Sequence, residues 1–283
     1  MPISWSRLTD EAISLSVTLQ SGQIFSWEQI DVGAVACWVG FIGSCLVALR
    51  ENDGIQYAAL SSASTCLHGD LYKFFRLDVE CPHWNPLNAA HSAALARCRG
   101  LRLLRQEPLE CLFAFILSSL NNVKRITSLV HKLKHLSTPV KALGRSWHPF
   151  PSVETLAAVS EVNLRAQAFG YRSRYVVETS EILRSGNVDL LCLLSMPLTD
   201  ARSYLMKLPG VGQKVADCVL LYSFGFDTVP VDVHIYRMAC RDFKLPHTTL
   251  NRRAVNRVQE AFAKQYPEEP GWAQLLLFHA ERL

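Results

Sequence analysis

The stretch KLPGVGQKVADCV, from Lys207 to Val219, places a lysine two residues after a Gly-x-Gly turn. Lys214 opens a segment otherwise made of Val, Ala, Cys, Leu and one Asp, a composition that indicates a buried helix. The positive end of the helix dipole disfavours a cation at such a start. Lys214 is therefore either a solvated lysine at a helix start or an amine with a chemical task there.

The turn predicts a helix-hairpin-helix motif at about residues 199–225. We expect Pro209 to stop the first helix, and Gly210 and Gly212 to adopt positive φ and leave backbone N–H groups bare. Beside the start of the second helix, these groups would form a cradle that suits a phosphate of a nucleic acid backbone. Glycine turns between helices that only pack together are the alternative.

The position of Lys214 suits nucleophilic chemistry. Removal from water and the positive helix end would both favour its uncharged amine, which attacks carbon centres and can form a Schiff base. Cys218 lies one helical turn further on, so it is expected on the same face.

A second stretch, VPVDVHIYRMACR, supplies a carboxylate and a histidine. Pro230 fixes the entry to the next helix, and Asp232 is placed as its N-cap. Most aspartates in this position are only caps, but beside an activated lysine Asp232 could also stabilise positive charge on a sugar. His234 is either a phosphate contact or an ordinary surface histidine.

The composition is that of a folded protein kept in a reducing compartment. The chain has 283 residues, 49% of them hydrophobic, a net charge of +4 and nine cysteines. The cysteines are scattered and never in C-x-x-C spacing, so we expect no cofactor, neither zinc nor an iron–sulfur cluster. The most apolar stretch, CLFAFILSSL, is too short for a membrane span and indicates a buried helix. The N-terminus has no pattern of a secretory signal.

The pattern along the chain predicts an α+β fold with two domains. Short apolar runs such as ACWVGFIG and CLVALR, broken by IDVGA, IGS and ENDG, predict an antiparallel sheet with ENDG as a hairpin turn. Helical spacing takes over from about Leu104. We therefore expect a β-rich N-terminal domain at 1–104 and a larger all-α domain at 105–283.

Several residues mark the ends of the expected helices. Pro108 suits the first helical position, and Ser152 and Thr199 suit N-caps. Gly225 is expected to end the helix that Lys214 begins.

Motifs over nearly the whole chain resemble one known family. In order, they are SGQIFSW (21–27), GLRLLRQEPLECLFAFILSS (100–119), FGYRSRYV (169–176), LPGVGQKVADC (208–218), VDVH (231–234) and GWAQLLLF (271–278). Together they resemble the eukaryotic type of 8-oxoguanine DNA glycosylase within the helix-hairpin-helix glycosylases. The resemblance implies base excision repair of double-stranded DNA with an associated lyase activity.

The resemblance implies a catalytic pair and a base pocket. The lysine at Lys214 would attack C1′ of a flipped nucleotide, with Asp232 assisting, and a Schiff base would lead to β-elimination. The oxidised base carries a hydrogen on N7, where guanine has a bare acceptor, and a carbonyl at Gly22 would accept it. Further residues implied to touch the base are Gln274 at the Watson–Crick edge, Phe278 on one face and Cys218 on the other.

The resemblance also implies the contacts to the rest of the DNA. Tyr171 matches the wedge residue, and Arg172 and Arg125 match the arginines that read the opposite cytosine. The other implied DNA contacts are Asn121, Gly210, Gly212, Gln213 and His234. Main-chain carbonyls of Met206, Leu208 and Val211 are implied to hold a monovalent cation at the hairpin.

One residue departs from the family pattern. Leu120 stands where the family has the first of three asparagines after the two serines, a residue that helps to occupy the emptied site. A leucine could wedge into the stack but cannot hydrogen-bond there, which puts discrimination for cytosine in doubt.

Two alternatives to this function stay open. Superfamily members that act on adenine or oxidised pyrimidines usually carry a four-cysteine cluster near the C-terminus, and this chain has no cysteine after Cys240. Members that act on alkylated bases lack the hairpin lysine. The second alternative is a non-catalytic DNA-binding module. For a glycosylase we expect a nuclear location, with a mitochondrial pool as the alternative, and a monomer.

Overall fold

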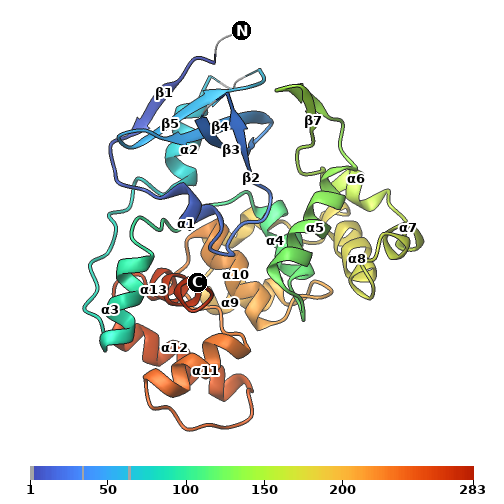
Figure 1. The fold of residues 1–283 in the computed structure, drawn as a ribbon. Helices are drawn as coiled ribbons and strands as arrows, with labels where there is room; N and C mark the ends of the chain where they lie inside the picture. Colours follow the sequence, from blue (N-terminus) through green and yellow to red (C-terminus); the bar gives the residue numbers. More distant parts are fainter. Residues whose placement is uncertain (1–2, 34, 63–64) are drawn as a thin grey trace.

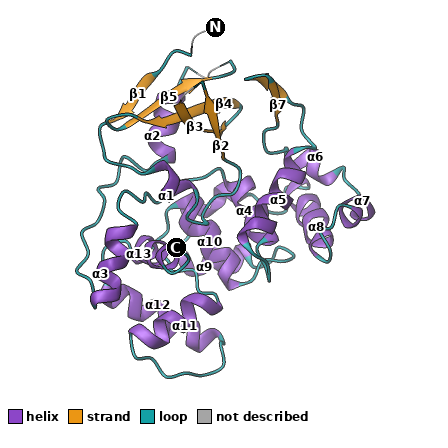
Figure 2. Cartoon of the chain, viewed as in Figure 1, coloured by secondary structure: helices purple, strands orange, loops and turns teal. Residues whose placement is uncertain are grey.

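The computed structural model describes residues 3–33, 35–62 and 65–283. A five-stranded antiparallel sheet lies at one end of the molecule, and helices make up most of the rest (Figures 1 and 2). The predicted α+β fold is confirmed. No helix in the described ranges is long and apolar enough to span a membrane.

The sheet has the strand order β1-β5-β4-β3-β2. Its strands are β1 Ser6–Thr9, β2 Glu28–Val32, β3 Val35–Ile42, β4 Cys45–Glu51 and β5 Ile55–Ala59. The predicted turn ENDG joins β4 to β5, with the Asn52 N–H donating to the Gly54 carbonyl at 2.9 Å. The expectation that IDVGA breaks the sheet was wrong in part, because its first three residues end β2 and pair with β3.

The two faces of the sheet are covered by different segments. One face packs Trp38, Leu49 and Ile55 against helices α1 (Leu15–Leu19) and α2 (Leu67–Phe74). The other face packs against Trp147 of a small hairpin, β6 (Val140–Ala142) and β7 (Arg145–Trp147), which follows α5 in the helical part of the chain. Figure 1 shows this hairpin beside the sheet. Both faces are thus buried, and the sheet is fixed to the helical part.

The helices form one large core. They are α3 Ala89–Arg97, α4 Pro108–Leu117, α5 Val123–Lys134, α6 Val153–Ala157, α7 Glu161–Ala166, α8 Arg172–Arg184, the 3₁₀ helix η1 Leu190–Ser195, α9 Leu198–Leu205, α10 Gln213–Phe224, α11 Val233–Asp242, α12 Arg252–Gln265 and α13 Pro270–Ala280. Helix α4, predicted as buried, packs closely on α10 and has every residue from Cys111 to Leu117 buried. Helix α3 packs on α13, so this segment of the N-terminal half contributes to the helical core.

Most predicted helix ends are confirmed. Pro108 occupies the first turn of α4, the Ser152 hydroxyl accepts from the Thr155 N–H at the start of α6, and Gly225 ends α10 with φ of 70°. The expectation for Thr199 was wrong: Pro197 is the N-cap of α9, and the Thr199 hydroxyl donates to the Asp200 carboxylate instead.

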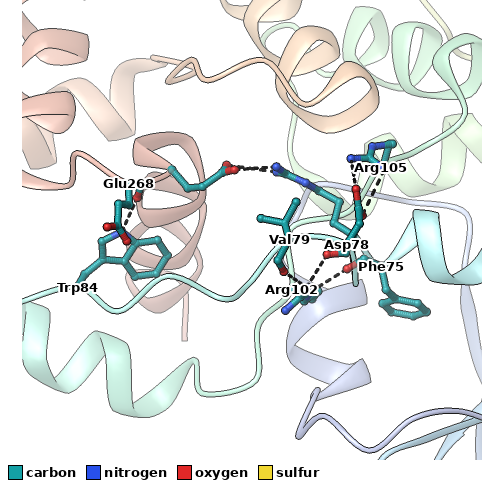
Figure 3. Close-up of polar contacts among 9 residues, drawn as sticks. Phe75, Asp78, Val79, Trp84, Arg102, Arg105 and Glu268 are labelled. Carbon is teal, nitrogen blue, oxygen red and sulfur yellow. Dashed lines mark hydrogen bonds and ion pairs between the residues drawn. The ribbon is translucent and has the colours of Figure 1, made fainter.

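Arg102 joins the sheet side to the helical side. Its buried guanidinium donates to the carbonyls of Phe75, Arg76 and Val79 and forms an ion pair with Glu11. Figure 3 shows Arg102 beside Phe75 and Val79. The same view shows the Arg105–Asp78 ion pair and, further away, Trp84, whose indole N–H donates to the Glu268 carbonyl. A buried cation with several charge-assisted partners holds its neighbours in one geometry. These contacts place the segment after α2 against the start of α13.

Candidate active site

The hairpin lies between α9 and α10, as the sequence predicts. Gly210 has φ of +79°, and a Cβ there would come within 2.7 Å of the Tyr175 ring, so only glycine fits. Gly212 differs from the expectation. It has φ of −92° as the N-cap of α10, and a Cβ there would meet nothing within 4 Å. Pro209 also does not stop α9, which has already ended at Leu205. The open side at Gly212 leaves the start of α10 accessible to a phosphate.

Lys214 lies in the first turn of α10 and points into a cavity of about 370 Å³. Its Nζ donates to the Ser118 hydroxyl at 3.3 Å and lies 5.0 Å from the centroid of the Phe115 ring. The side chain is half-buried. The amine thus lies at the cavity wall, between an aromatic ring and a hydroxyl group.

Asp232 faces the same cavity from the start of α11. Its Oδ1 accepts from the backbone N–H groups of His234 and Ile235 at 2.9 and 3.0 Å, so the predicted N-cap is confirmed. This cap fixes the direction of the carboxylate toward the cavity. The site thus holds an amine and a carboxylate on two different helices around one hollow.

The predicted base-binding residues all line this cavity. They are Gly22, Cys218, Gln274 and Phe278. Gly22 has φ of +92°, and Gln274 is only 3% exposed. The Gln274 Oε1 is buried and has no hydrogen-bond partner within the described residues. A buried acceptor without a donor is costly, so a ligand that brings a donor would be favoured there.

Cys218 forms a neutral part of the cavity wall. Burial raises the pKa of its thiol to about 12, although the nearby Lys214 cation opposes the shift. Because the thiolate is the nucleophilic form, Cys218 does not compete with the lysine. Its position suits contact with the face of a ligand.

A second hollow adjoins the first along the hairpin. It is lined by residues 118–122, Arg125, residues 212–215 and residues 232–234, so the predicted contacts Asn121, Gln213 and His234 all face it. Leu120 lies at the tip of the 118–122 loop, 94% exposed and with φ of +48°. An apolar side chain held out at the rim of a hollow is available for contact with a partner.

The residues predicted to contact the opposite DNA strand and the gap donate hydrogen bonds to backbone carbonyls in this structure. Arg172, only 3% exposed, donates to the carbonyls of Ser119 and Leu120. The Tyr171 hydroxyl also donates to the Ser119 carbonyl, at 3.1 Å. Arg125 donates to the Ala168 carbonyl at 3.2 Å. Their predicted contacts with DNA stay predictions. In this structure Arg172 and Tyr171 support the loop that carries Leu120, whereas Arg125 contacts the segment before α8.

The predicted cation site differs from a site built on side chains. The described residues contain no group of three or more His, Cys, Asp and Glu side chains that could hold one. The predicted cation site uses carbonyls instead. Of its three residues, Met206 is the C-cap of α9, and the Leu208 carbonyl accepts from the Val211 N–H at 3.1 Å.

Two groups at the site were missed from the sequence. Asp217, fully buried and three residues after Lys214 in α10, accepts from Arg202, Thr228 and Gln259, and thereby ties α9, α10 and α12 together. The sequence could have indicated this role, because an aspartate within an apolar helix is buried and therefore needs hydrogen-bonding partners. Arg282 also lines the cavity, but no motif in the sequence around it indicates a functional role.

Comparisons with known proteins give a consistent result. Residues 7–112 match the family described as 8-oxoguanine DNA glycosylase, N-terminal domain, and residues 113–265 match the HhH-GPD superfamily base excision DNA repair proteins. The Arabidopsis thaliana N-glycosylase/DNA lyase OGG1 is 37% identical over 97% of this chain and 79% of its own. The Saccharomyces cerevisiae N-glycosylase/DNA lyase is 32% identical over 95% and 83%.

Solved structures share the fold over the full length. The structure of MBOgg1 in complex with a low-affinity DNA ligand superposes with a TM-score of 0.85, at 25% identity, and covers 100% of this chain and 99% of that one. The Clostridium acetobutylicum 8-oxoguanine glycosylase/lyase in complex with double-stranded DNA gives a TM-score of 0.82 at 21% identity, over 95% and 92%.

Proposed function

This chain belongs to the HhH-GPD superfamily of base excision repair proteins, as a member with the 8-oxoguanine DNA glycosylase N-terminal domain, and from that premise we propose its reaction. It removes 8-oxoguanine from duplex DNA and cleaves the strand at the resulting abasic site. It is therefore a bifunctional DNA glycosylase and lyase. The arrangement of Lys214 and Asp232 around one cavity is the observation that carries this assignment.

The chemistry follows from the positions of the two groups. The target nucleotide must leave the stack, because its glycosidic bond is inaccessible inside a duplex. The Lys214 Nζ then attacks C1′, and the bond to the base breaks with its electrons leaving on the base. The Asp232 carboxylate stabilises positive charge that develops on the sugar. The departing base takes up a proton. The amine, now bonded to C1′, gives a proton to O4′ as the C1′–O4′ bond breaks, and a Schiff base forms. The Schiff base acidifies the hydrogens on C2′, and loss of one of them expels the 3′-phosphate, so that β-elimination cleaves the strand.

The cavity can hold the departing base. Gln274 offers its unpartnered Oε1, while Phe278 and Cys218 offer surfaces for the two faces of a planar ring. Gly22, with no side chain, allows a base to approach the backbone closely. A backbone carbonyl there accepts the N7 hydrogen of 8-oxoguanine and repels the N7 lone pair of guanine.

A single-turnover assay tests this function. The wild-type protein is expected to excise 8-oxoguanine from a duplex with cytosine opposite, and to leave guanine in the same sequence intact. Lys214→Gln should abolish excision, whereas Lys264→Gln, which removes an exposed amine on α12, should not. A wild-type protein that binds the duplex but never cleaves it would be a binding module, which contradicts the proposal.

The proposal extends to partners and location. The substrate is double-stranded DNA with cytosine opposite the lesion. Because Lys214 and Asp232 of the same chain face one cavity, the site needs no second subunit, which supports a monomer. A nuclear location is proposed because the resemblance to the eukaryotic type of the family implies it, with a mitochondrial pool as the alternative. Sedimentation of the protein and imaging of a fluorescent fusion test these points.

The hairpin is proposed to bind a monovalent cation through the carbonyls of Met206, Leu208 and Val211. The positive φ of Gly210 in this turn supports the proposal, because it redirects backbone groups there. Such an ion would favour binding of a phosphate at the start of α10. Affinity for duplex DNA should be higher in potassium or sodium chloride than in tetramethylammonium chloride of equal ionic strength.

A further inference from the structure

Arg282 lies at the wall of the base cavity, just after the end of α13. A Cβ placed on Gly22 would lie 2.9 Å from the Arg282 Nη1, so the guanidinium lies against the backbone of Gly22. The Arg282 Cζ is 5.4 Å from the centroid of the Phe278 ring. The guanidinium is thus placed between two residues that contact the base in the proposed function.

The guanidinium of Arg282 has no hydrogen bond or ion pair with any residue that the structure describes. Partial burial lowers the pKa of this group. Nearby Arg241, by contrast, pairs with Asp242 and Glu281. A partly desolvated cation is costly unless an acceptor reaches it. Because Arg282 lies at the wall of a ligand cavity, a bound ligand can supply the hydrogen-bond acceptor.

8-Oxoguanine presents the matching edge. Oxidation places a carbonyl on C8 beside the hydrogen on N7, so the edge has an acceptor next to a donor. The proposed function assigns the Gly22 carbonyl as the acceptor for the N7 hydrogen, and the Arg282 guanidinium against the same residue supplies an N–H donor beside it. Together they would offer the reverse order, an acceptor next to a donor. Guanine has a C–H at position 8 and cannot accept a hydrogen bond there.

We propose that Arg282 is a base-contacting residue, which donates to the C8 carbonyl of the extruded 8-oxoguanine while the Gly22 carbonyl accepts the N7 hydrogen. The inference rests on the proposed function and adds a second contact to lesion recognition. A charge-assisted hydrogen bond in a partly desolvated site makes a large contribution to binding. The opposing possibility is that Arg282 only fills the empty cavity and moves aside when a base enters.

The first experiment compares Arg282→Met with wild type in two reactions. One is single-turnover excision of 8-oxoguanine, and the other is strand cleavage at a preformed abasic site, which needs Lys214 but no base. The ratio of the two rates should fall roughly ten- to hundred-fold in the variant. Arg97→Met removes an equally charged, exposed side chain on α3 and should leave the ratio as in wild type.

The second experiment measures binding without cleavage. The probe is a duplex with 2′-fluoro-8-oxodeoxyguanosine, and the reference is the same duplex with a tetrahydrofuran abasic analogue. Arg282→Met should lower the preference for the lesion over the abasic duplex roughly ten-fold or more, and Arg282→Lys should restore part of it. The ratio cancels any general loss of attraction to phosphates.

The outcomes are distinct. An unchanged ratio in both experiments, or tighter binding of the lesion by Arg282→Met, contradicts the inference, and tighter binding is what a cavity-filling arginine predicts. Neither result would affect the proposed function, which is read from wild-type excision. A wild-type protein without excision overturns both.

Discussion

Asp232 combines two roles in one side chain. Its Oδ1 caps α11 through two backbone N–H groups, and the same carboxylate faces the cavity beside Lys214. The cap follows from the sequence, because Asp after Pro-Val and before an apolar helix is a common helix start. The catalytic role does not follow from the local sequence, because it depends on α10 and α11 meeting at one hollow.

Asp232→Asn separates the two roles. Asparagine caps a helix about as well as aspartate, so the free energy of unfolding should change by less than about 1 kcal/mol. The rate of excision should fall roughly hundred-fold or more, because the charge facing the sugar is lost. Urea denaturation and single-turnover kinetics measure the two effects. If the variant loses stability, and the loss of activity is explained by the smaller fraction of folded protein, then capping α11 is the only role of Asp232.

Leu120 has a backbone conformation that its side chain disfavours. A leucine at φ of +48° is strained, whereas asparagine adopts this conformation readily. Leu120→Asn should therefore keep or slightly raise stability. It should also increase the ratio of excision opposite cytosine to excision opposite adenine, because an amide can hydrogen-bond in the emptied site. Equal ratios for the two proteins would contradict this role.

The elements around the hairpin show where prediction from sequence succeeds and where it fails. The helices, the Gly225 C-cap and the N-caps at Ser152 and Asp232 were predicted correctly, because each depends on residues within one turn. Gly212 was not, because positive φ was inferred from residue type alone. The start of α9 at Pro197 was also missed, since both Pro and Thr are common at helix starts.

The two hairpin glycines should respond differently to alanine. Gly210→Ala introduces a Cβ at positive φ against the Tyr175 ring and should cost about 1–3 kcal/mol of stability. Gly212→Ala has free space and negative φ, so it should cost only the difference between glycine and alanine at an N-cap, about 1 kcal/mol or less. Both should weaken binding to undamaged duplex DNA, since both flank the phosphate cradle. Thermal unfolding and titration with an undamaged duplex check these outcomes, and equal stability losses would contradict the assigned geometry.

At the scale of the whole molecule, the site depends on contacts between distant segments. Gly22 comes from the segment between α1 and β2, Lys214 from α10, and Gln274 and Phe278 from α13. The two domains and their order were expected from the sequence, but contacts such as those of Arg102 and Asp217 were not. Their partners are up to 91 residues away in the chain for Arg102, so no local pattern reports them.

A buried polar cluster joins α3 to the C-terminal helices. The His91 Nδ1 and the Tyr266 hydroxyl are 2.6 Å apart, and the His91 Nε2 lies 3.0 Å from the Asp242 carboxylate. Burial alone would raise the pKa of Asp242, but hydrogen bonds from Arg241 and His91 lower it below its ordinary value. Because the folded pKa is depressed, the ionised carboxylate stabilises the fold above the unfolded pKa of about 3.9, and this stabilisation is lost as the pH falls through the folded value.

Asp242→Asn tests this cluster. The variant should be less stable than wild type by about 1–3 kcal/mol at pH 7, and the difference should narrow as the pH falls toward 4 and below. Asp31→Asn, which changes an exposed carboxylate on β2, is the control and should show little difference at any pH. Urea denaturation across this range gives the free energies. A difference that is constant with pH would contradict the role of the ionised carboxylate.

The central claim is that the amine of Lys214 is the nucleophile. Reduction with borohydride during the reaction traps a Schiff base as a stable adduct, and peptide mapping by mass spectrometry identifies the residue that carries the sugar. With an 8-oxoguanine duplex, the adduct is predicted on Lys214, in the peptide that follows Lys207, and none should form with Lys214→Gln. An adduct on another lysine or on the N-terminal amine, or excision without any trapped adduct, would contradict the claim.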